Sequence, residues 1–115
     1  MHVTRTYYML MAQDMDRAIA FYEDALCMRR QSFSPYWSEL KSGGALIALH
    51  SGGDGSRQRT GLGFEVDDLE AACAAVRTFG GFIEKEPQAR PGEPIRLAEA
   101  RDPEGNVFTL AQYVS

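Results

Sequence analysis

The segment DMDRAIAFYEDAL at residues 14–26 has the pattern of a capped amphipathic helix. Its first residue, Asp14, is a favoured N-cap, and the apolar residues after it recur at the spacing of one helix face. The segment DLEAACAAVRTF at residues 68–79 repeats this pattern, with Asp68 standing 54 positions after Asp14. Its buried face is expected to contain Leu69, Ala72, Cys73, Val76 and Phe79. The chain is therefore predicted to contain two copies of one structural unit.

The segments around each predicted helix favour strands, and they repeat as well. Strands are expected at residues 6–11, 30–34, 36–41 and 45–50, and again at 61–66, 82–85, 95–101 and 106–113. Gly43-Gly44 and the DPEGN segment at residues 102–106 supply turns between neighbouring strands. Each copy has the order βαβββ, which predicts an α+β fold.

A glycine-rich segment without apolar residues, SGGDGSRQR at 51–59, separates the two copies. Its composition is typical of a flexible connector. We therefore expect one domain over residues 1–115, with module one at 1–50, the connector at 51–59 and module two at 60–115. Because a module of about 55 residues alone has a marginal core, the two sheets are expected to pair around a cup, with the helices on the outer face.

Composition and charge exclude several classes of partner. The 115 residues include only 12 Lys and Arg, and the formal net charge is −4, so a nucleic-acid partner is not expected. No run approaches the roughly 20 apolar residues that cross a bilayer, and residues 1–6 lack the apolar core of a signal peptide. We expect no membrane partner, a cytoplasmic location, and reduced thiols at Cys27 and Cys73.

The paired βαβββ order, the helix phrase FYEDAL at residues 21–26 and the DPEGN turn resemble the vicinal oxygen chelate superfamily. That superfamily contains glyoxalase I, extradiol dioxygenases, fosfomycin-resistance enzymes and bleomycin-binding proteins. The resemblance covers nearly the whole chain, but both phrases are structural and carry no chemistry. Function therefore has to be argued from other residues.

The resemblance also points to the positions of a metal site. Metalloenzymes of this superfamily hold their metal with His, Gln or Glu at four strand positions, two in each module. The corresponding residues here are Tyr7 and Ala48 in module one and Gly61 and Thr109 in module two. None carries an imidazole or a carboxylate, and a catalytic metal needs about three such protein ligands. We therefore expect no metal, no cofactor and no catalytic residue at the usual place.

The face opposite the helices is predicted to form the cup. The residues expected to bind a ligand there are Tyr7, Met9, Phe33, Tyr36, Trp37, Glu39, Ala48, His50, Gly61, Glu65 and Thr109. Trp37 and Glu39 share one face of their strand, so a ring and a carboxylate can meet a ligand that has a flat group and a positive charge. Trp37 can alternatively fill a sheet gap or a dimer seam. Residues 87–94, rich in proline, are expected to form a rim or lid.

Three hypotheses about function follow. The first is a metal-free binding protein, similar to the bleomycin-resistance branch, that sequesters a planar or cationic drug or metabolite. The second is a glyoxalase-type lyase, isomerase or dioxygenase, with a metal displaced to His50 and Glu65 or with Tyr7 and Glu65 as an acid/base pair. The third is a structural or regulatory module with a closed cup. The resemblance further implies a homodimer, since members of the superfamily commonly complete each cup with a second chain.

Overall fold

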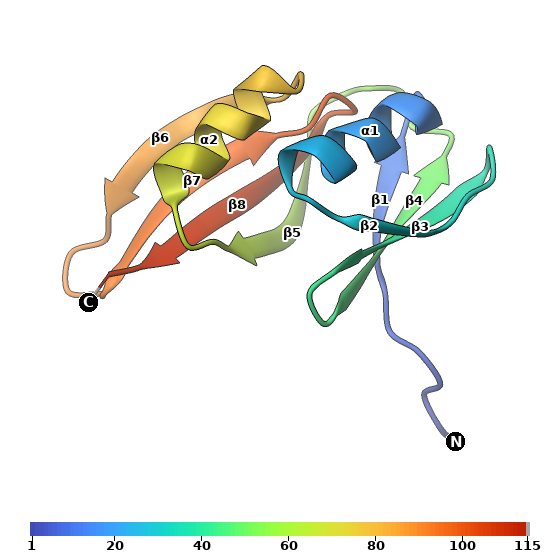
Figure 1. The fold of residues 1–115 in the computed structure, drawn as a ribbon, viewed down its shortest axis with the longest axis horizontal. Coiled ribbons are helices and arrows are strands. Elements are labelled where there is room, and N and C mark those ends of the chain that lie inside the picture. Colours follow the sequence, from blue (N-terminus) through green and yellow to red (C-terminus); the bar gives the residue numbers. More distant parts are fainter. Residues whose placement is uncertain (115) are drawn as a thin grey trace.

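The computed structural model describes residues 1–114 and contains two four-stranded sheets, each with one helix (Figure 1). Module one consists of β1 (Tyr8–Ala12), α1 (Met15–Ala25), β2 (Arg29–Ser32), β3 (Trp37–Ser42) and β4 (Ala45–Ser51). Module two consists of β5 (Gln58–Glu65), α2 (Leu69–Thr78), β6 (Phe82–Ala89), β7 (Ile95–Arg101) and β8 (Asn106–Tyr113). The predicted α+β fold with two βαβββ modules is confirmed.

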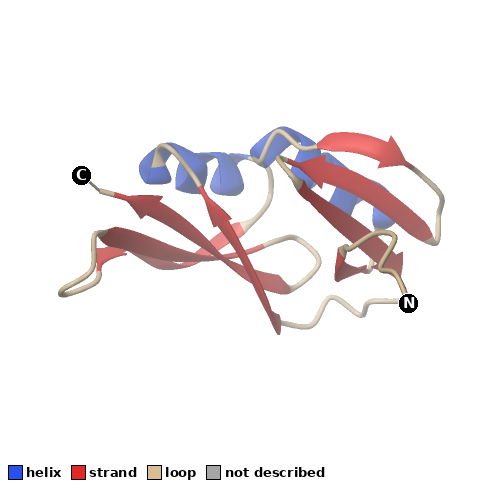
Figure 2. Cartoon of the chain, turned by 90° about the horizontal axis from the view of Figure 1, so that it is seen from below, coloured by secondary structure: helices blue, strands red, loops and turns tan. Residues whose placement is uncertain are grey.

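The two sheets have the same topology. Their strand orders are β1-β4-β3-β2 and β5-β8-β7-β6, and in each the first strand runs parallel to the last while the other pairs are antiparallel. Figure 2 shows both helices on one side of the sheets, and α1 packs against α2. The opposite side of both sheets, here called the open face, has no helix over it. No helix within residues 1–114 combines the length and apolar content needed to cross a membrane.

Both helices begin where the repeated aspartates predicted. Asp14 and Asp68 have extended backbone, and their Oδ1 atoms accept hydrogen bonds from the amides of Arg17 and Ala71 at 3.1 and 3.0 Å. The prediction that Phe79 lies on the buried face of the second helix is wrong. Phe79 is 43% exposed, because α2 ends at Thr78 and the helical periodicity no longer directs the next side chain inward.

The boundaries of two strands, β5 and β6, differ most from expectation. Strand β5 begins at Gln58 rather than at residue 61, and its ladder with β8 shifts register between Arg59 and Gly63. Gly61 has a φ of +77° inside this irregular stretch, which interrupts the alternation that marks a strand. Strand β6 runs on to Ala89, so the first part of the expected 87–94 lid is strand.

The core lies between the helices and the sheets and spans both modules. Phe21 and Tyr22 of α1 are fully buried and meet edge to face, with ring centroids 4.9 Å apart. Phe108 of β8 lies 6.2 Å from Tyr22 and 5.5 Å from Phe64 of β5. Because rings from both modules pack together, the two units share one core.

A buried polar network at the DPEGN turn joins the modules. The Tyr22 hydroxyl donates to Asp102 Oδ2 at 2.6 Å, and Asn106 Nδ2 donates to the same oxygen and to the carbonyl of Met11. Burial raises the pKa of the Asp102 carboxyl and, together with that carboxyl, the pKa of Tyr22. The network therefore ties helix α1 and strand β1 to the β7–β8 turn.

Glu104 of the same turn completes the connection. Its side chain is fully buried, and its Oε1 accepts the backbone amides of Gln13 and Asp14 at 2.9 and 2.8 Å. The Arg17 guanidinium donates to its Oε2 at 2.7 Å. A carboxylate from module two thus neutralises the N-terminal end of the first helix, where negative charge is favoured.

We expect Glu104→Gln to lower the free energy of unfolding by about 2 to 3 kcal/mol, because it removes the buried charge that accepts two backbone amides and the half-exposed Arg17 guanidinium. Urea unfolding followed by circular dichroism measures this. The control is Glu86→Gln, which breaks an exposed ion pair with Arg77 and should cost about 1 kcal/mol or less. Equal stability of the two variants would show that the turn does not hold the modules together.

Candidate functional site

The open face of the first sheet gathers several of the predicted ligand-binding residues. The register places Met9 and Glu39 on either side of Ala48, so three strands contribute one row of side chains. Trp37 pairs with His50 in the next row, with ring centroids 5.8 Å apart. These five residues are adjacent because alternate side chains of neighbouring strands point to the same face.

Tyr7 and Arg5, from the segment before β1, add to this surface. The Tyr7 ring meets Trp37 edge to face with centroids 5.3 Å apart, and the Arg5 guanidinium lies 5.8 Å from the Tyr7 centroid. Arg5 donates to Glu39 Oε1 at 2.6 Å, while the Trp37 indole donates to Glu39 Oε2 at 2.8 Å. The hydrogen bond from Arg5, and then that from Trp37, lowers the pKa of Glu39.

This arrangement changes the expected role of Glu39. The carboxylate was predicted to meet a positive charge on a ligand, together with Trp37. In the structure a cation of the same chain, Arg5, already holds that place. We name the rings of Tyr7, Trp37 and His50 the aromatic wall.

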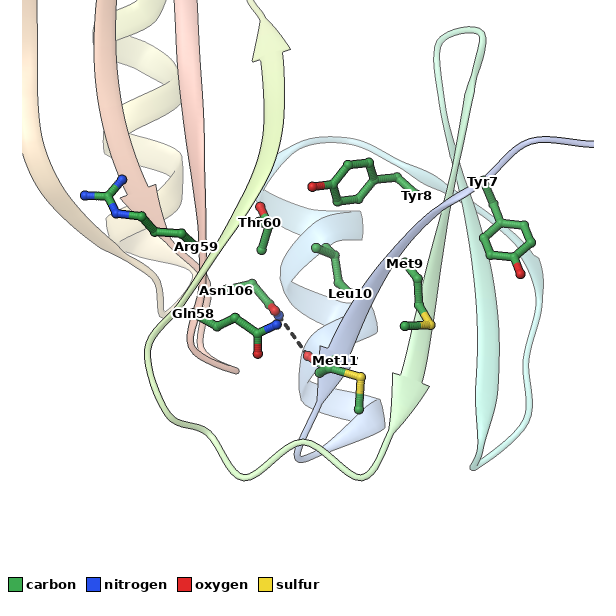
Figure 3. A pocket seen from close by; sticks show the side chains of 9 residues that line it. All are labelled: Tyr7, Tyr8, Met9, Leu10, Met11, Gln58, Arg59, Thr60 and Asn106. Carbon is green, nitrogen blue, oxygen red and sulfur yellow. Dashed lines mark hydrogen bonds between the residues drawn. The ribbon is translucent and has the colours of Figure 1, made fainter.

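An open cleft of about 370 Å³ lies between β1 and β5, the inner edges of the two sheets (Figure 3). Its lining residues are Tyr7, Tyr8, Met9, Leu10, Met11, Gln58, Arg59, Thr60 and Asn106. In Figure 3, Tyr7 and Met9 project to one side of β1, over the first sheet, whereas Arg59 extends over the second. The cleft therefore joins the two halves of the open face.

A second cavity of about 340 Å³ adjoins this cleft on the second sheet. It is lined by Arg59, Thr60, Gly61, Leu62, Glu99, Val107, Phe108 and Thr109. Gly61 and Thr109, the predicted site residues of module two, thus lie together. Since Arg59 and Thr60 line both cavities, the structure brings Tyr7, Met9, Gly61 and Thr109 into one continuous region.

Sequence reasoning missed Arg59 and Glu99. Arg59 stands in the glycine-rich stretch whose composition predicts a connector, so the sequence pattern does not place it in strand β5. The place of Glu99 could have been predicted from the sequence, because residues 99 and 109 are equally distant from the middle of the DPEGN turn and should therefore pair. In the antiparallel hairpin Glu99 indeed pairs with Thr109.

Three predicted site residues lie elsewhere. Tyr36 is 74% exposed, and Phe33 is 49% exposed with its ring beside Arg30. Both belong to the link between β2 and β3, where no strand register directs side chains onto the open face. Glu65, at the end of β5, lines a separate cavity with Val66, Asp67, Gln112 and Tyr113.

The placement of Glu65 bears on the enzyme hypothesis. Tyr7 lines the cleft between β1 and β5, and His50 lies on the first sheet, whereas Glu65 lines neither of the two adjoining cavities. Within this chain, the structure does not bring together the proposed Tyr7–Glu65 acid/base pair or the His50–Glu65 metal site.

The expected rim segment has one part in place. Gln88, Ala89 and Arg90 border a cavity of about 220 Å³ that also includes Glu99 and Thr109. Residues 88–90 therefore flank the region around Thr109, although residues 88 and 89 belong to β6 rather than to a free lid.

The four family positions do not fit a metal. Ala48 is fully buried and offers a methyl group, Gly61 has no side chain, and Tyr7 and Thr109 offer neutral hydroxyls. Glu39 has both oxygens engaged by donors of this chain. In the part of the chain that the structure describes, no three His, Cys, Asp or Glu side chains come together as a set of metal ligands.

Comparison with known proteins agrees with this fold. Residues 4–110 match the Glyoxalase/Bleomycin resistance protein/Dioxygenase superfamily. The chain belongs to this superfamily. It is 35% identical to the lactoylglutathione lyase of Haemophilus influenzae, covering 84% of this chain and 83% of the relative. It is 28% identical to a probable lactoylglutathione lyase of Vibrio cholerae, covering 90% and 86%.

Solved structures are similar across the whole fold. A glyoxalase/bleomycin resistance protein/dioxygenase family enzyme from Burkholderia phytofirmans has a TM-score of 0.79 at 21% identity, covering 94% of this chain and 97% of that one. The fosfomycin resistance protein FosX from Listeria monocytogenes has a TM-score of 0.79 at 16% identity, covering 97% and 94%. The resemblance expected from the FYEDAL and DPEGN segments is confirmed.

The lowered pKa of Glu39 gives a test of its contacts with Arg5 and Trp37. A carboxyl whose pKa is lowered on folding stabilises the fold at neutral pH and loses that contribution as pH falls through the folded-state pKa. We expect the fluorescence of Trp37, the single tryptophan, to change with a midpoint below 4.5, the ordinary Glu pKa, while circular dichroism stays constant.

Two variants control this titration. Glu39→Gln should abolish the fluorescence transition, and Arg5→Gln should move its midpoint upward. A midpoint that is the same in the Arg5→Gln variant would show that Arg5 does not hold the carboxylate in solution.

Proposed function

We propose that this chain is a metal-free small-molecule binding protein that holds a planar ligand on its open face without altering it. The observation that carries the proposal is the set of side chains at the four family positions: a phenol, a methyl group, a hydrogen atom and a hydroxyl. These groups can shape a cavity but do not supply the three or so imidazole or carboxylate ligands that a catalytic metal needs. They leave binding as the chemistry that the site supports.

The aromatic wall supports a planar ligand. The Trp37 ring is fixed by its hydrogen bond to Glu39 and by edge-on contacts with Tyr7 and His50. A ring held in place loses little entropy when a ligand packs on it, and an aromatic contact contributes about 0.5 to 1.5 kcal/mol beyond area burial. A cationic ligand finds less support, because it has to replace Arg5 at Glu39.

We further propose that two copies of the chain complete the cup as a homodimer. The aromatic wall lies over the first sheet, while Gly61 and Thr109 lie over the second, so one chain presents a shallow surface. Large apolar side chains on this surface remain exposed, among them Tyr7 at 47% and Met9 at 45%. A second copy laid on the open face would cover them and deepen the cleft.

The second candidate is a glyoxalase-type lyase, isomerase or dioxygenase. It is favoured by the relatives that carry the name lactoylglutathione lyase. Such an enzyme would need metal ligands or an acid/base pair other than the residues at the four family positions. Elemental analysis of the purified protein separates the binder from a metalloenzyme: the binder contains no stoichiometric zinc, nickel, iron or manganese, and the metalloenzyme contains about one equivalent.

We expect Tyr7→Ala and Trp37→Ala to weaken binding of a planar probe, 2-naphthamide, by about tenfold or more, because truncating an anchoring ring costs about 2 kcal/mol. Isothermal titration calorimetry measures the affinity. Both variants should keep most of their stability. Phe108→Ala, on the helix-facing side of β8, should instead cost about 3 to 5 kcal/mol of unfolding free energy.

The opposite pattern would contradict the aromatic wall. If Trp37→Ala lowers the stability as much as Phe108→Ala and leaves the affinity for 2-naphthamide unchanged, Trp37 belongs to the core or to a dimer seam. Failure of the wild-type chain to bind any planar probe would contradict the proposed function itself.

We expect sedimentation equilibrium at micromolar concentration to give twice the 12.8 kDa mass of the chain. Met9→Lys, which places a charge on the exposed open face, should shift the equilibrium toward monomer. Ala74→Lys, on the exposed side of α2 and so on the helix side of the sheets, is the matched control. A wild-type monomer under these conditions would remove the dimer proposal.

A further inference from the structure

A cluster of ion-paired side chains on the second sheet carries more positive than negative charge. Four cationic side chains, Arg57, Arg59, Lys85 and Arg101, surround two carboxylates, Glu84 and Glu99, so this group has a net charge of +2. The whole chain has a formal net charge of −4. This cluster, of which Arg59 and Glu99 line the cavity with Gly61 and Thr109, is therefore opposite in net charge to the chain as a whole.

Most of these cations are engaged within the chain. Arg57 and Arg101 both donate to Glu84, with distances between 2.8 and 3.0 Å. The Arg101 guanidinium also lies 4.3 Å from the centroid of the Phe82 ring. Lys85 lies 3.4 Å from Glu99 Oε2. Their positive charge is fixed in place and only partly offset.

Arg59 differs from the others. Its Nη1 lies 3.0 Å from Glu99 Oε1, but this oxygen is buried and has no hydrogen-bond partner among the described residues. The contact is thus an ion pair without an aligned N–H donor. The Arg59 side chain is 64% exposed, so its planar set of donors is free to meet a ligand.

The module repeat allows Arg59 to be compared with its equivalent in module one, Arg5. Arg5 and Arg59 are 54 positions apart, as are Tyr7 and Gly61. The two glutamates are equivalent as well, because Glu39 pairs with Ala48 in module one and Glu99 pairs with Thr109 in module two. In module one the corresponding carboxylate receives hydrogen bonds from Arg5 and Trp37. In module two the equivalent pair, Arg59 and Glu99, lies beside a cavity, and Glu99 Oε1 accepts no hydrogen bond from the described residues.

We propose that Arg59 binds the carboxylate of a planar aromatic acid. Arg59 lines both the cleft that contains Tyr7 and the cavity that contains Gly61 and Thr109. Gly61 has no side chain and lines the same cavity as Arg59, and a guanidinium binds a carboxylate through two parallel hydrogen bonds. Glu99 positions Arg59, and Lys85 offsets the charge of Glu99. This inference rests on the proposed function, since it assigns a class of ligand to the same site.

Three naphthalene probes of nearly equal shape test the charge preference: 2-naphthoate, neutral 2-naphthamide and cationic 2-naphthylmethylamine. Calorimetric titration of the full chain should give an affinity for the carboxylate about tenfold higher than for the amide, and the cation should bind most weakly. Arg59→Gln should reduce the ratio of carboxylate to amide affinity to about one.

The matched control is Arg77→Gln, which removes an exposed arginine on α2 that pairs with Glu86, away from the open face. It should leave all three affinities as they are. A ratio of carboxylate to amide affinity that survives Arg59→Gln, or three equal affinities in the wild-type chain, would overturn the carboxylate site alone. Binding of none of the probes would contradict the planar-ligand function, and the carboxylate site with it.

Discussion

The buried carboxylates of the DPEGN turn hold the two modules in one arrangement. Asp102 accepts the Tyr22 hydroxyl, and Glu104 accepts two amides and a guanidinium at the start of α1. Hydrogen bonds to buried charges depend strongly on geometry, and a buried charge without its partner is costly. A rotation of one module against the other would leave both carboxylates unpaired. The turn thereby fixes the spacing of β1 and β5, and with it the cleft that contains Tyr7 and Arg59.

The network lies on the helix side, so the open face is free to vary. Alternate residues of each strand point to opposite sides, and the core rings Phe21 and Tyr22 of α1 pack against Phe108 of β8 between the helices and the sheets. A methyl group at Ala48 or a hydrogen at Gly61 removes no contact from this core. Side chains at the metal-binding positions of the superfamily can therefore change while the fold keeps its stability. This explains how relatives and structural neighbours with different names can share one fold.

Sequence pattern predicted what depends on local periodicity. The aspartate caps and the 54-residue repeat located both helices, and alternation placed Met9, Ala48 and Thr109 on the open face. Periodicity did not predict contacts between residues that are distant in the sequence. The hydrogen bond from Arg5 to Glu39 joins residues far apart in sequence, and nothing in periodicity shows it. Arg59 was hidden for a local reason, because the positive φ of Gly61 and the shifted register break the alternation of β5.

Duplication explains how two walls of unlike chemistry arise on one face. Each module places an arginine two residues before its first family position and a glutamate opposite its last, so the repeat supplies the same ion pair twice. What surrounds the pair decides its chemistry. In module one Trp37 and Tyr7 enclose it, the carboxylate takes two hydrogen bonds, and the surface is aromatic with its charge balanced. In module two Gly61 stands in place of the Tyr7 ring, and Lys85 also forms an ion pair with Glu99. The N–H donors of Arg59 remain available to a ligand. The divergence of two equivalent pairs thus provides an aromatic surface and a cation along one cleft, the two features that a planar acid requires.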